Sequence, residues 1–207
     1  MPDPIDRPPG GHYFDRAPAS VSSEETVTVR LPDVSFTMQT DRGVFSHGRL
    51  DAGTAVLLRA APELPGAGTG LDLGCGTGAI ALTMARRARG LAVWAVDVNE
   101  RARALCAANA RANGVAVEVT APDDVPRDLR FDVIWSNPPI RIGKSALHEL
   151  LLAWLPRLTP SGRAVLVVHK HLGADSLQRW LVEQGYPTDR LASAKGYRVL
   201  DVRPHPA

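Results

Sequence analysis

From residue 68 onward, short apolar runs alternate with longer segments in which apolar residues recur every three or four positions. The short runs are bounded by glycine, proline or polar residues, which is the pattern of buried strands. They predict strands at 71–73, 91–96, 115–119, 131–135, 163–168 and 197–202. The longer segments predict helices at 79–89, 99–113, 145–156 and around 177–185. This alternation predicts an α/β fold, in which a mainly parallel twisted sheet carries helices on both faces.

The pattern upstream of this core is different. Residues 26–30 and 35–40 alternate apolar and polar positions on either side of a short turn, and they predict a β-hairpin. A short helix is expected from Thr54 until Pro62, which ends it. Residues 1–24 are rich in Pro, Gly, Asp and Ser without periodicity, and we expect a poorly ordered tail. The expected organisation is one domain over 25–207, with the hairpin and helix at 25–62 and the α/β core at 68–207.

Composition narrows the class of protein. The 207 residues are 44% hydrophobic and 22% charged, which suits one large domain with an ample core. A net charge of +2 is too small to indicate a strongly basic nucleic-acid binder. Of the 24 basic residues only Lys144, Lys170 and Lys195 are lysines, and the others are arginines, which can bind phosphate with two parallel hydrogen bonds. No apolar run approaches the roughly 20 residues of a membrane span, so no membrane partner is expected. Cys75 and Cys106 lack disulfide or metal-ligand spacing, so we expect a cytoplasmic protein without a metal.

A glycine-rich loop is the first candidate site. Residues 71–78 run from an apolar strand through glycines at 74, 76 and 78 into a helix. Glycine lets such a loop turn at positive φ, and the helix start offers free N–H groups to a ligand. Asp97 ends the next strand, about 20 residues later, where an acidic side chain can bind ribose hydroxyls. These features alone predict a nucleotide-like cofactor, and a dinucleotide is not excluded.

A second candidate site follows the strand at 131–135, where the chain reads Ser136-Asn137-Pro138-Pro139. The Asn137 side-chain oxygen and the Pro138 carbonyl could accept two hydrogen bonds from one planar NH₂ group. Holding those hydrogens out of plane favours the pyramidal geometry of nucleophilic attack. The matching electrophile is a sulfonium methyl, which needs alignment and no metal. Asn-Pro-Pro can also be a simple turn, but the glycine loop and Asp97 upstream favour the chemical interpretation.

Together, the glycine loop, Asp97 and Asn137-Pro138-Pro139 resemble a Rossmann-like class I S-adenosylmethionine-dependent amino-methyltransferase. More narrowly, the chain resembles the methyltransferase-small family, in the compact stand-alone form of the guanine-N2 ribosomal RNA methyltransferases of the small subunit methyltransferase C type. The resemblance extends to His12-Tyr13-Phe14. The stretches that carry it are Phe45-Ser46, Leu50 to Thr54, Ser136 to Lys144 and Gly196 to Leu200.

The resemblance implies a role for each matching residue. S-adenosylmethionine would be the cofactor, with Asp97 on its ribose and Asp123 facing its adenine. Asn137, Pro138 and Pro139 would hold the target amine. Many amino-methyltransferases have Tyr or Phe where this chain has Ile140, so base stacking would be weaker or come from elsewhere, with Tyr197 a candidate. The remaining expected cofactor contacts are Asp72, Gly74, Cys75, Gly76, Gly78, Val98 and also Asn137, and the expected substrate contacts are Phe45, Ile140, Tyr197 and Arg198.

The implied partner is ribosomal RNA or a ribosomal subunit assembly intermediate. Phosphate contacts are expected from arginines such as Arg42, Arg49, Arg141 and Arg198. An N6-adenine or protein-glutamine methyltransferase shares Asn-Pro-Pro and stays open, although Ile140 and the Phe45 to Thr54 block argue against it. A nicotinamide-dependent oxidoreductase would leave Asn-Pro-Pro unexplained, and intact motifs argue against a non-catalytic RNA-binding relic.

Several other side chains have simpler interpretations. His169 and His171 follow a strand and are expected to be exposed, with no metal role. His148 is expected to cap or pack a helix. Trp154 and Trp180 lie at helical spacing with leucines and are expected in the core.

Overall fold

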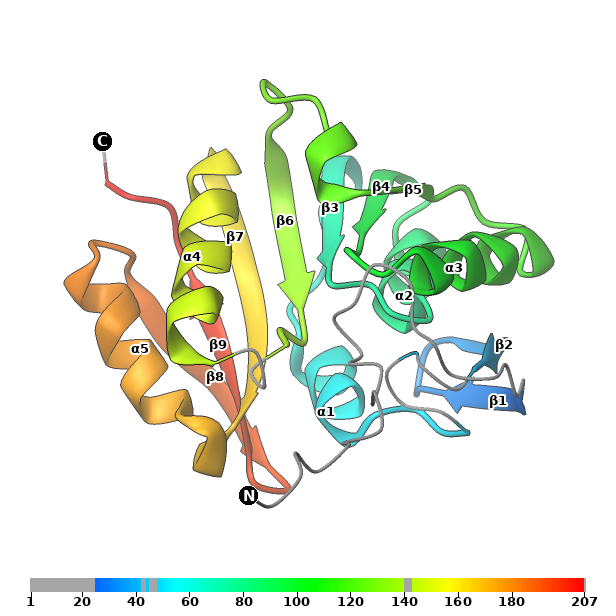
Figure 1. Ribbon diagram of the computed structural model, residues 1–207, viewed down its shortest axis with the longest axis horizontal. Helices are drawn as coiled ribbons and strands as arrows, with labels where there is room; N and C mark the ends of the chain where they lie inside the picture. Colours follow the sequence, from blue (N-terminus) through cyan, green and yellow to red (C-terminus); the bar gives the residue numbers. More distant parts are fainter. Residues whose placement is uncertain (1–24, 42–43, 45–47, 140–142, 207) are drawn as a thin grey trace, which may run out of the picture.

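The computed structural model describes residues 25–41, 44, 48–139 and 143–206, and these form a seven-stranded sheet and a separate hairpin. The strand order is β5-β4-β3-β6-β7-β9-β8 (Figure 1). Neighbours from β5 to β7 are parallel, whereas β9 runs antiparallel to both β7 and β8. The strands are β3 Ala67–Leu73, β4 Gly90–Val96, β5 Glu118–Thr120, β6 Phe131–Ser136, β7 Leu158–His169, β8 Thr188–Ala194 and β9 Tyr197–Val202.

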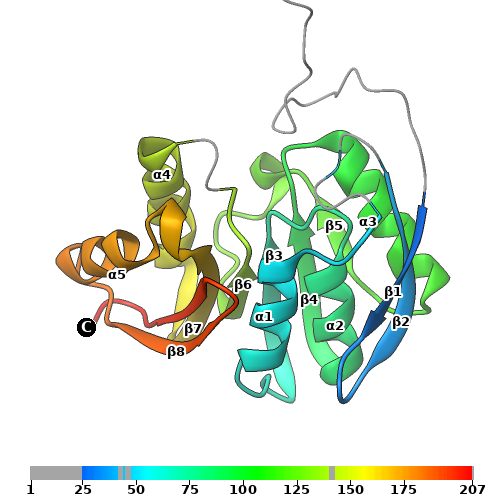
Figure 2. The ribbon, with the colours of Figure 1, turned by 90° about the horizontal axis from the view of Figure 1, so that it is seen from below.

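Helices cover both faces of this sheet because alternate strand residues point to opposite sides. In β6, Trp135 packs with the α1–α3 side and Ile134 with the α4–α5 side. Figure 2 shows α1 and α2 on one side of the strands and α4 and α5 on the other. The helices are α1 Ala52–Ala60, α2 Ala79–Arg87, α3 Glu100–Ala112, α4 Lys144–Trp154 and α5 Ala174–Glu183, with single turns at η1 Pro122–Asp124, η3 Leu155–Arg157 and η4 Lys170–Leu172. None of the described helices is long and apolar enough to cross a membrane.

The hairpin of β1 Glu25–Arg30 and β2 Ser35–Thr40 is tied to the glycine loop. Asn109 of α3 pairs with the backbone of Gln39, accepting from its N–H at 2.7 Å and donating to its carbonyl at 2.9 Å. The same Asn109 amide donates to the Thr77 carbonyl at 2.9 Å. One buried side chain therefore joins the hairpin, α3 and the loop that follows β3.

The predicted fold class, with a mainly parallel sheet and an N-terminal hairpin, is confirmed. Three local expectations are corrected. The strand expected at 115–119 is Glu118–Thr120, since Asn113 and Gly114 still close α3 through their hydrogen bonds. The helix expected from Thr54 begins at Ala52, because the Asp51 carboxylate caps it by accepting from the Thr54 N–H. Strand β8 was not predicted, because this exposed edge strand is mostly polar.

Candidate active site

A cavity of about 360 Å³ opens at the carboxyl ends of the parallel strands. In an open α/β sheet this edge is where ligands bind, because the loops that follow the strands converge there. Nine of the expected site residues line this cavity. They are Asp97, Asn137, Gly74, Cys75, Gly76, Val98, Pro138, Pro139 and Tyr197.

The glycine loop forms the floor of this cavity. Gly74, Gly76 and Gly78 have φ values of 77°, 52° and 89°, a left-handed conformation that favours glycine. The loop is fixed to the next strand, because the N–H groups of Gly74 and Cys75 both donate to the Val96 carbonyl at 2.9 Å. Gly78 does not line the cavity: a Cβ there would lie 2.7 Å from the Cys106 sulfur. Gly78 therefore allows α2 and α3 to pack closely at the edge of the loop.

Asp97 lines the cavity and holds the loop in place. One carboxylate oxygen accepts from the Gly76 N–H and the other from the Asn99 N–H, each at 2.9 Å. Burial raises the pKa of Asp97, and the hydrogen bonds from Asn99 and Gly76 lower it in part. Each oxygen keeps a second lone pair, so this carboxylate can also accept from two hydroxyl groups of a ligand.

Asp72 lies behind the loop and is fully buried. One of its oxygens accepts from the Ala81 N–H at 2.9 Å, and the other has no hydrogen-bond partner among the described residues. Burial, with a smaller contribution from the nearby Asp97, raises the pKa of Asp72 to about 8, against the effect of the Ala81 hydrogen bond. A buried carboxyl group with a free oxygen, next to a second acidic group, fits a cofactor that carries positive charge.

The raised pKa of Asp72 predicts how stability depends on pH. A carboxyl group that keeps its proton longer in the folded than in the unfolded protein destabilises the fold as pH rises. The free energy of unfolding should therefore fall between about pH 4 and about pH 8, with at most about 1.4 kcal/mol per pH unit from this group. Asp72→Asn should flatten that fall in denaturant titrations at several pH values. An unchanged slope in the variant would contradict the burial argument.

Asn137 is held by the N-cap residue of α1 and by a side chain of its first turn. Its NH₂ group donates to the Asp51 carboxylate at 2.7 Å and to the Thr54 hydroxyl at 3.1 Å. Because a carboxylate can only accept, this contact fixes which end of the amide is which. The Asn137 oxygen receives no hydrogen bond from any described residue, and Asn137 lines the cavity with Pro138 and Pro139. The arrangement leaves an oriented acceptor beside the glycine loop.

Tyr197 also lines the cavity. Its ring packs against Gly53, where a Cβ would lie 2.7 Å from the Tyr197 ring. The His169 ring meets it edge-on, with the ring centroids 4.8 Å apart. His169 is half-buried and lines the cavity, so the expectation that it is exposed is wrong, whereas His171 is exposed. Burial raises the pKa of Tyr197, and the nearby Asp51 raises it further.

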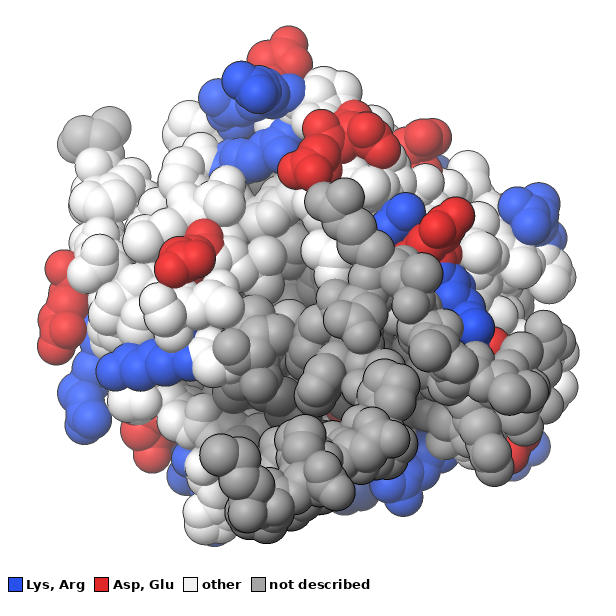
Figure 3. All heavy atoms as spheres, viewed as in Figure 1, with Lys and Arg blue, Asp and Glu red and all other residues white. Residues whose placement is uncertain are grey.

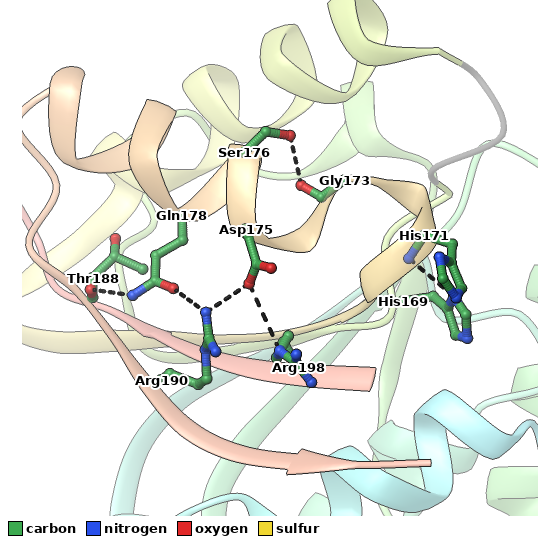
Figure 4. A network of polar contacts seen from close by, with 9 residues as sticks. All are labelled: His169, His171, Gly173, Asp175, Ser176, Gln178, Thr188, Arg190 and Arg198. Carbon is green, nitrogen blue, oxygen red and sulfur yellow. Dashed lines mark hydrogen bonds and ion pairs between the residues drawn. The ribbon is translucent and has the colours of Figure 1, made fainter. Parts of the chain in front are cut away.

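Other expected site residues lie elsewhere. Asp123 is exposed in η1 and does not line the cavity, although its neighbour Pro122 does. Arg198 is half-buried outside the cavity and pairs with Asp175 (Figure 4). Phe45 and Ile140, like the tail at 1–24 and the arginines at 42 and 141, lie outside the described residues. The described part of the chain contains no group of three His, Cys, Asp or Glu side chains placed to hold a metal ion.

Two of the remaining expectations concern helix packing. Trp154 is buried in the core, as predicted. Trp180 is only partly buried, because its ring stacks on His148 with centroids 3.5 Å apart. His148 therefore packs α4 against α5, in agreement with its expected structural role.

Asp51, Thr54 and His169 line the cavity, and the sequence pattern does not predict a role for them at this site. Asp51 and Thr54 belong to a stretch that carried the family resemblance, yet no role followed for either from the pattern alone. Their contacts with Asn137 join residues 86 and 83 positions apart, so no local signal shows them.

The chain is similar to known methyltransferases over most of its length. The methyltransferase small domain family matches residues 35–201. YbxB of Bacillus subtilis (strain 168), an uncharacterised protein, is 33% identical over 93% of this chain and 98% of its own length. Ribosomal RNA small subunit methyltransferase C of Chromohalobacter salexigens is 35% identical over 90% of this chain and 57% of its own length.

A solved structure shows the same fold. The T. Thermophilus 16S rRNA N2 methyltransferase RsmC, in complex with AdoMet and guanosine, matches with a TM-score of 0.72 and 25% identity. That match covers 88% of this chain and 51% of the other, so the chain spans about half of that protein. The match to residues 35–201 includes the glycine loop, Asp97 and Asn137. The chain belongs to the methyltransferase small domain family of S-adenosylmethionine-dependent methyltransferases.

Proposed function

We propose that this protein transfers a methyl group from S-adenosylmethionine to the N2 amine of a guanosine in ribosomal RNA, in the cytoplasm. The observation that carries the proposal is the locked Asn137 amide, whose free oxygen lies at the cavity beside the glycine loop. The named functions of the relatives support the same acceptor: one is a ribosomal RNA methyltransferase and another is an N2 methyltransferase with guanosine bound.

The cofactor site is proposed residue by residue. The Asp97 carboxylate would accept from the ribose hydroxyls while still holding Gly76. The backbone of Gly74, Cys75 and Gly76 would lie against the methionine part, with the free oxygen of Asp72 behind it. Val98, which is 46% exposed at the cavity, would cover the adenine. Of the other expected contacts, Asp123 is proposed at the adenine edge, and Gly78 is proposed only as a packing position.

The proposed reaction needs few groups from the protein. When bound, S-adenosylmethionine supplies an electrophilic methyl group on a sulfonium. The Asn137 oxygen and the Pro138 carbonyl accept from the two hydrogens of the guanine amine, which turns its lone pair toward that methyl group. As the N–C bond forms, the S–C bond breaks, and the amine then releases one proton to water. Asp51 and Thr54 hold the Asn137 amide in this orientation throughout.

The base must leave its helix to reach this cavity, because an amine inside a duplex cannot meet a methyl group at the strand ends. Tyr197 and the exposed Leu172 line the cavity and offer an apolar surface for the ring, with Phe45 and Ile140 also proposed as contacts. A ribosomal subunit assembly intermediate, in which proteins hold RNA open, is the proposed natural substrate. Adenine N6 and protein glutamine remain the alternative acceptors, because Asn-Pro-Pro also suits their planar amines.

A substituted RNA tests the proposed acceptor. Inosine lacks the exocyclic amine of guanosine and keeps the rest of the ring. A ribosomal RNA transcript made with inosine in place of guanosine should therefore accept no methyl group, while the unmodified transcript is labelled. Equal labelling of both transcripts would exclude guanine N2 and favour the adenine alternative.

A further inference from the structure

We propose that three exposed cations at the mouth of the cavity, Arg49, Lys170 and Lys195, form a basic rim that binds the phosphate backbone of the RNA. This proposal rests on the RNA substrate proposed above and adds the surface that meets it. All three side chains belong to exposed residues. They come from three segments far apart in the sequence that meet at the carboxyl end of β7.

Hydrogen bonds place these segments beside the cavity. His169 and Leu172 both line it, and Lys170 lies between them at the start of η4. The Lys170 N–H donates to the Gly196 carbonyl at 2.8 Å, which joins η4 to the turn between β8 and β9. Lys195 is in that turn. Arg49 itself lines the cavity.

The backbone at Lys195 is unusual. With a φ of 50°, it is the one non-glycine residue in the left-handed region within the described part of the chain. Glycine or asparagine normally takes such a position, because a larger side chain adds strain. The turn also packs tightly, since a Cβ at Gly196 would lie 2.8 Å from the His169 ring. A lysine held here at some strain is therefore a candidate for function.

Within the described part of the chain the rim cations have no acidic partner, whereas several arginines elsewhere are paired. Arg87 pairs with Asp33, and Arg163 with Asp201. Among the described residues, no ion pair or hydrogen bond joins Arg49, Lys170 or Lys195 to an acidic side chain. Unpaired cations in one place attract phosphate more than the small net charge of the chain indicates.

Two acidic side chains, Asp51 and Asp175, have other partners among the described residues. Asp51 accepts from Asn137 and from the Thr54 N–H. Asp175 accepts from Arg190 at 2.6 Å and lies 3.7 Å from Arg198, and Figure 4 shows both arginines converging on this carboxylate. Asp175 thus pairs with Arg190 of β8 and Arg198 of β9 and not with the rim lysines.

The place of the rim beside the cavity favours RNA over an acidic protein as the binding partner. A nucleotide presents a base and a phosphate a few ångströms apart, so a base in the cavity brings its backbone to the rim. Lysine binds phosphate as a compact point charge. Figure 3 shows the face that carries α4 and α3, where basic and acidic side chains are mixed outside the grey atoms.

The test removes the two lysines together. Lys170→Gln with Lys195→Asn takes away both charges, and asparagine tolerates the left-handed backbone. The matched control is Arg89→Gln with Arg127→Gln, which removes two exposed cations from the opposite edge of the sheet. Binding of a labelled single-stranded oligoribonucleotide is measured from low to high salt, and S-adenosylmethionine affinity is measured by calorimetry.

We expect the lysine variant to bind RNA about tenfold more weakly at low salt, with the slope of log K against log[salt] reduced by about 1.4–1.8. Its cofactor affinity and the RNA binding of the control should match those of the parent protein. The proposed rim would be contradicted by an unchanged salt slope, by an equal loss of RNA affinity in the control variant, or by a parallel loss of cofactor affinity. If the slope changes as expected while no guanosine is methylated, the rim stands and the proposed function fails.

Discussion

Replacing Asn137 with alanine should lower turnover by about 10²- to 10³-fold, the scale for removing one preorganised polar group from an active site. In the proposed reaction the Asn137 oxygen accepts from the target amine, and Asp51 and Thr54 hold it in that orientation. The affinity for S-adenosylmethionine should barely change, because the glycine loop is fixed by Val96 and Asp97 instead. Single-turnover rates and calorimetry separate the two effects. A variant that keeps its rate and loses cofactor affinity would assign Asn137 to the cofactor site.

The contact with Asp51 allows a sharper version of this experiment. Asn137→Asp alone places a second carboxylate against that of Asp51 and should be nearly inactive, because like charges in contact repel. Adding Asp51→Asn restores a hydrogen bond in the reverse direction, since the amide at position 51 then donates to the carboxylate at position 137. Activity should partly return in the double variant. No recovery would show that the contact does not orient the acceptor.

Replacing Asp97 with alanine should weaken S-adenosylmethionine binding by at least about 100-fold. A carboxylate that accepts from two ribose hydroxyls stabilises the complex by about 1.5–3 kcal/mol per hydrogen bond. The structure adds a second cause, because the variant also releases the N–H groups of Gly76 and Asn99. Calorimetric titration of the cofactor measures the change.

Two further variants help to assign the cause of that loss of affinity. Asp97→Asn keeps the shape and one acceptor, so its loss of affinity should be smaller. Asp128→Ala removes an exposed acidic group at the opposite edge of the sheet and should bind the cofactor normally. If Asp97→Ala bound S-adenosylmethionine as tightly as the parent protein, Asp97 would be only a support for the loop.

The sequence predicted the order of strands and helices because each central strand is buried on both faces and reads as an apolar run. Trp135 and Ile134, for example, are both buried on opposite sides of β6. The pattern failed at β8, an edge strand that packs on β9 by backbone pairing and keeps most of its side chains exposed. Polar edge strands carry little periodic signal.

Site residues that follow directly from the order of strands could be predicted from the sequence. Those that depend on contacts between distant parts of the chain could not. The glycine loop, Asp97 and Asn137 each end a strand, so parallel pairing alone brings them to one edge. The support from Asp51 and Thr54 depends on how α1 packs against the sheet. Gly78 was placed in the ligand site because its spacing matched, whereas its Cα faces Cys106. The domain limits at 25, 62 and 68 stay a prediction.

The most direct test of the account is to identify the methylated atom. Purified protein is incubated with labelled S-adenosylmethionine and ribosomal subunits or naked ribosomal RNA that lack the modification. The RNA is digested to nucleosides, which are separated and counted, and the protein fraction is counted alongside. We predict label in N2-methylguanosine, with about 10²- to 10³-fold less of it from the Asn137→Ala variant in the same incubation time. Label in N6-methyladenosine, or in a glutamine of the protein fraction, would contradict the proposed function.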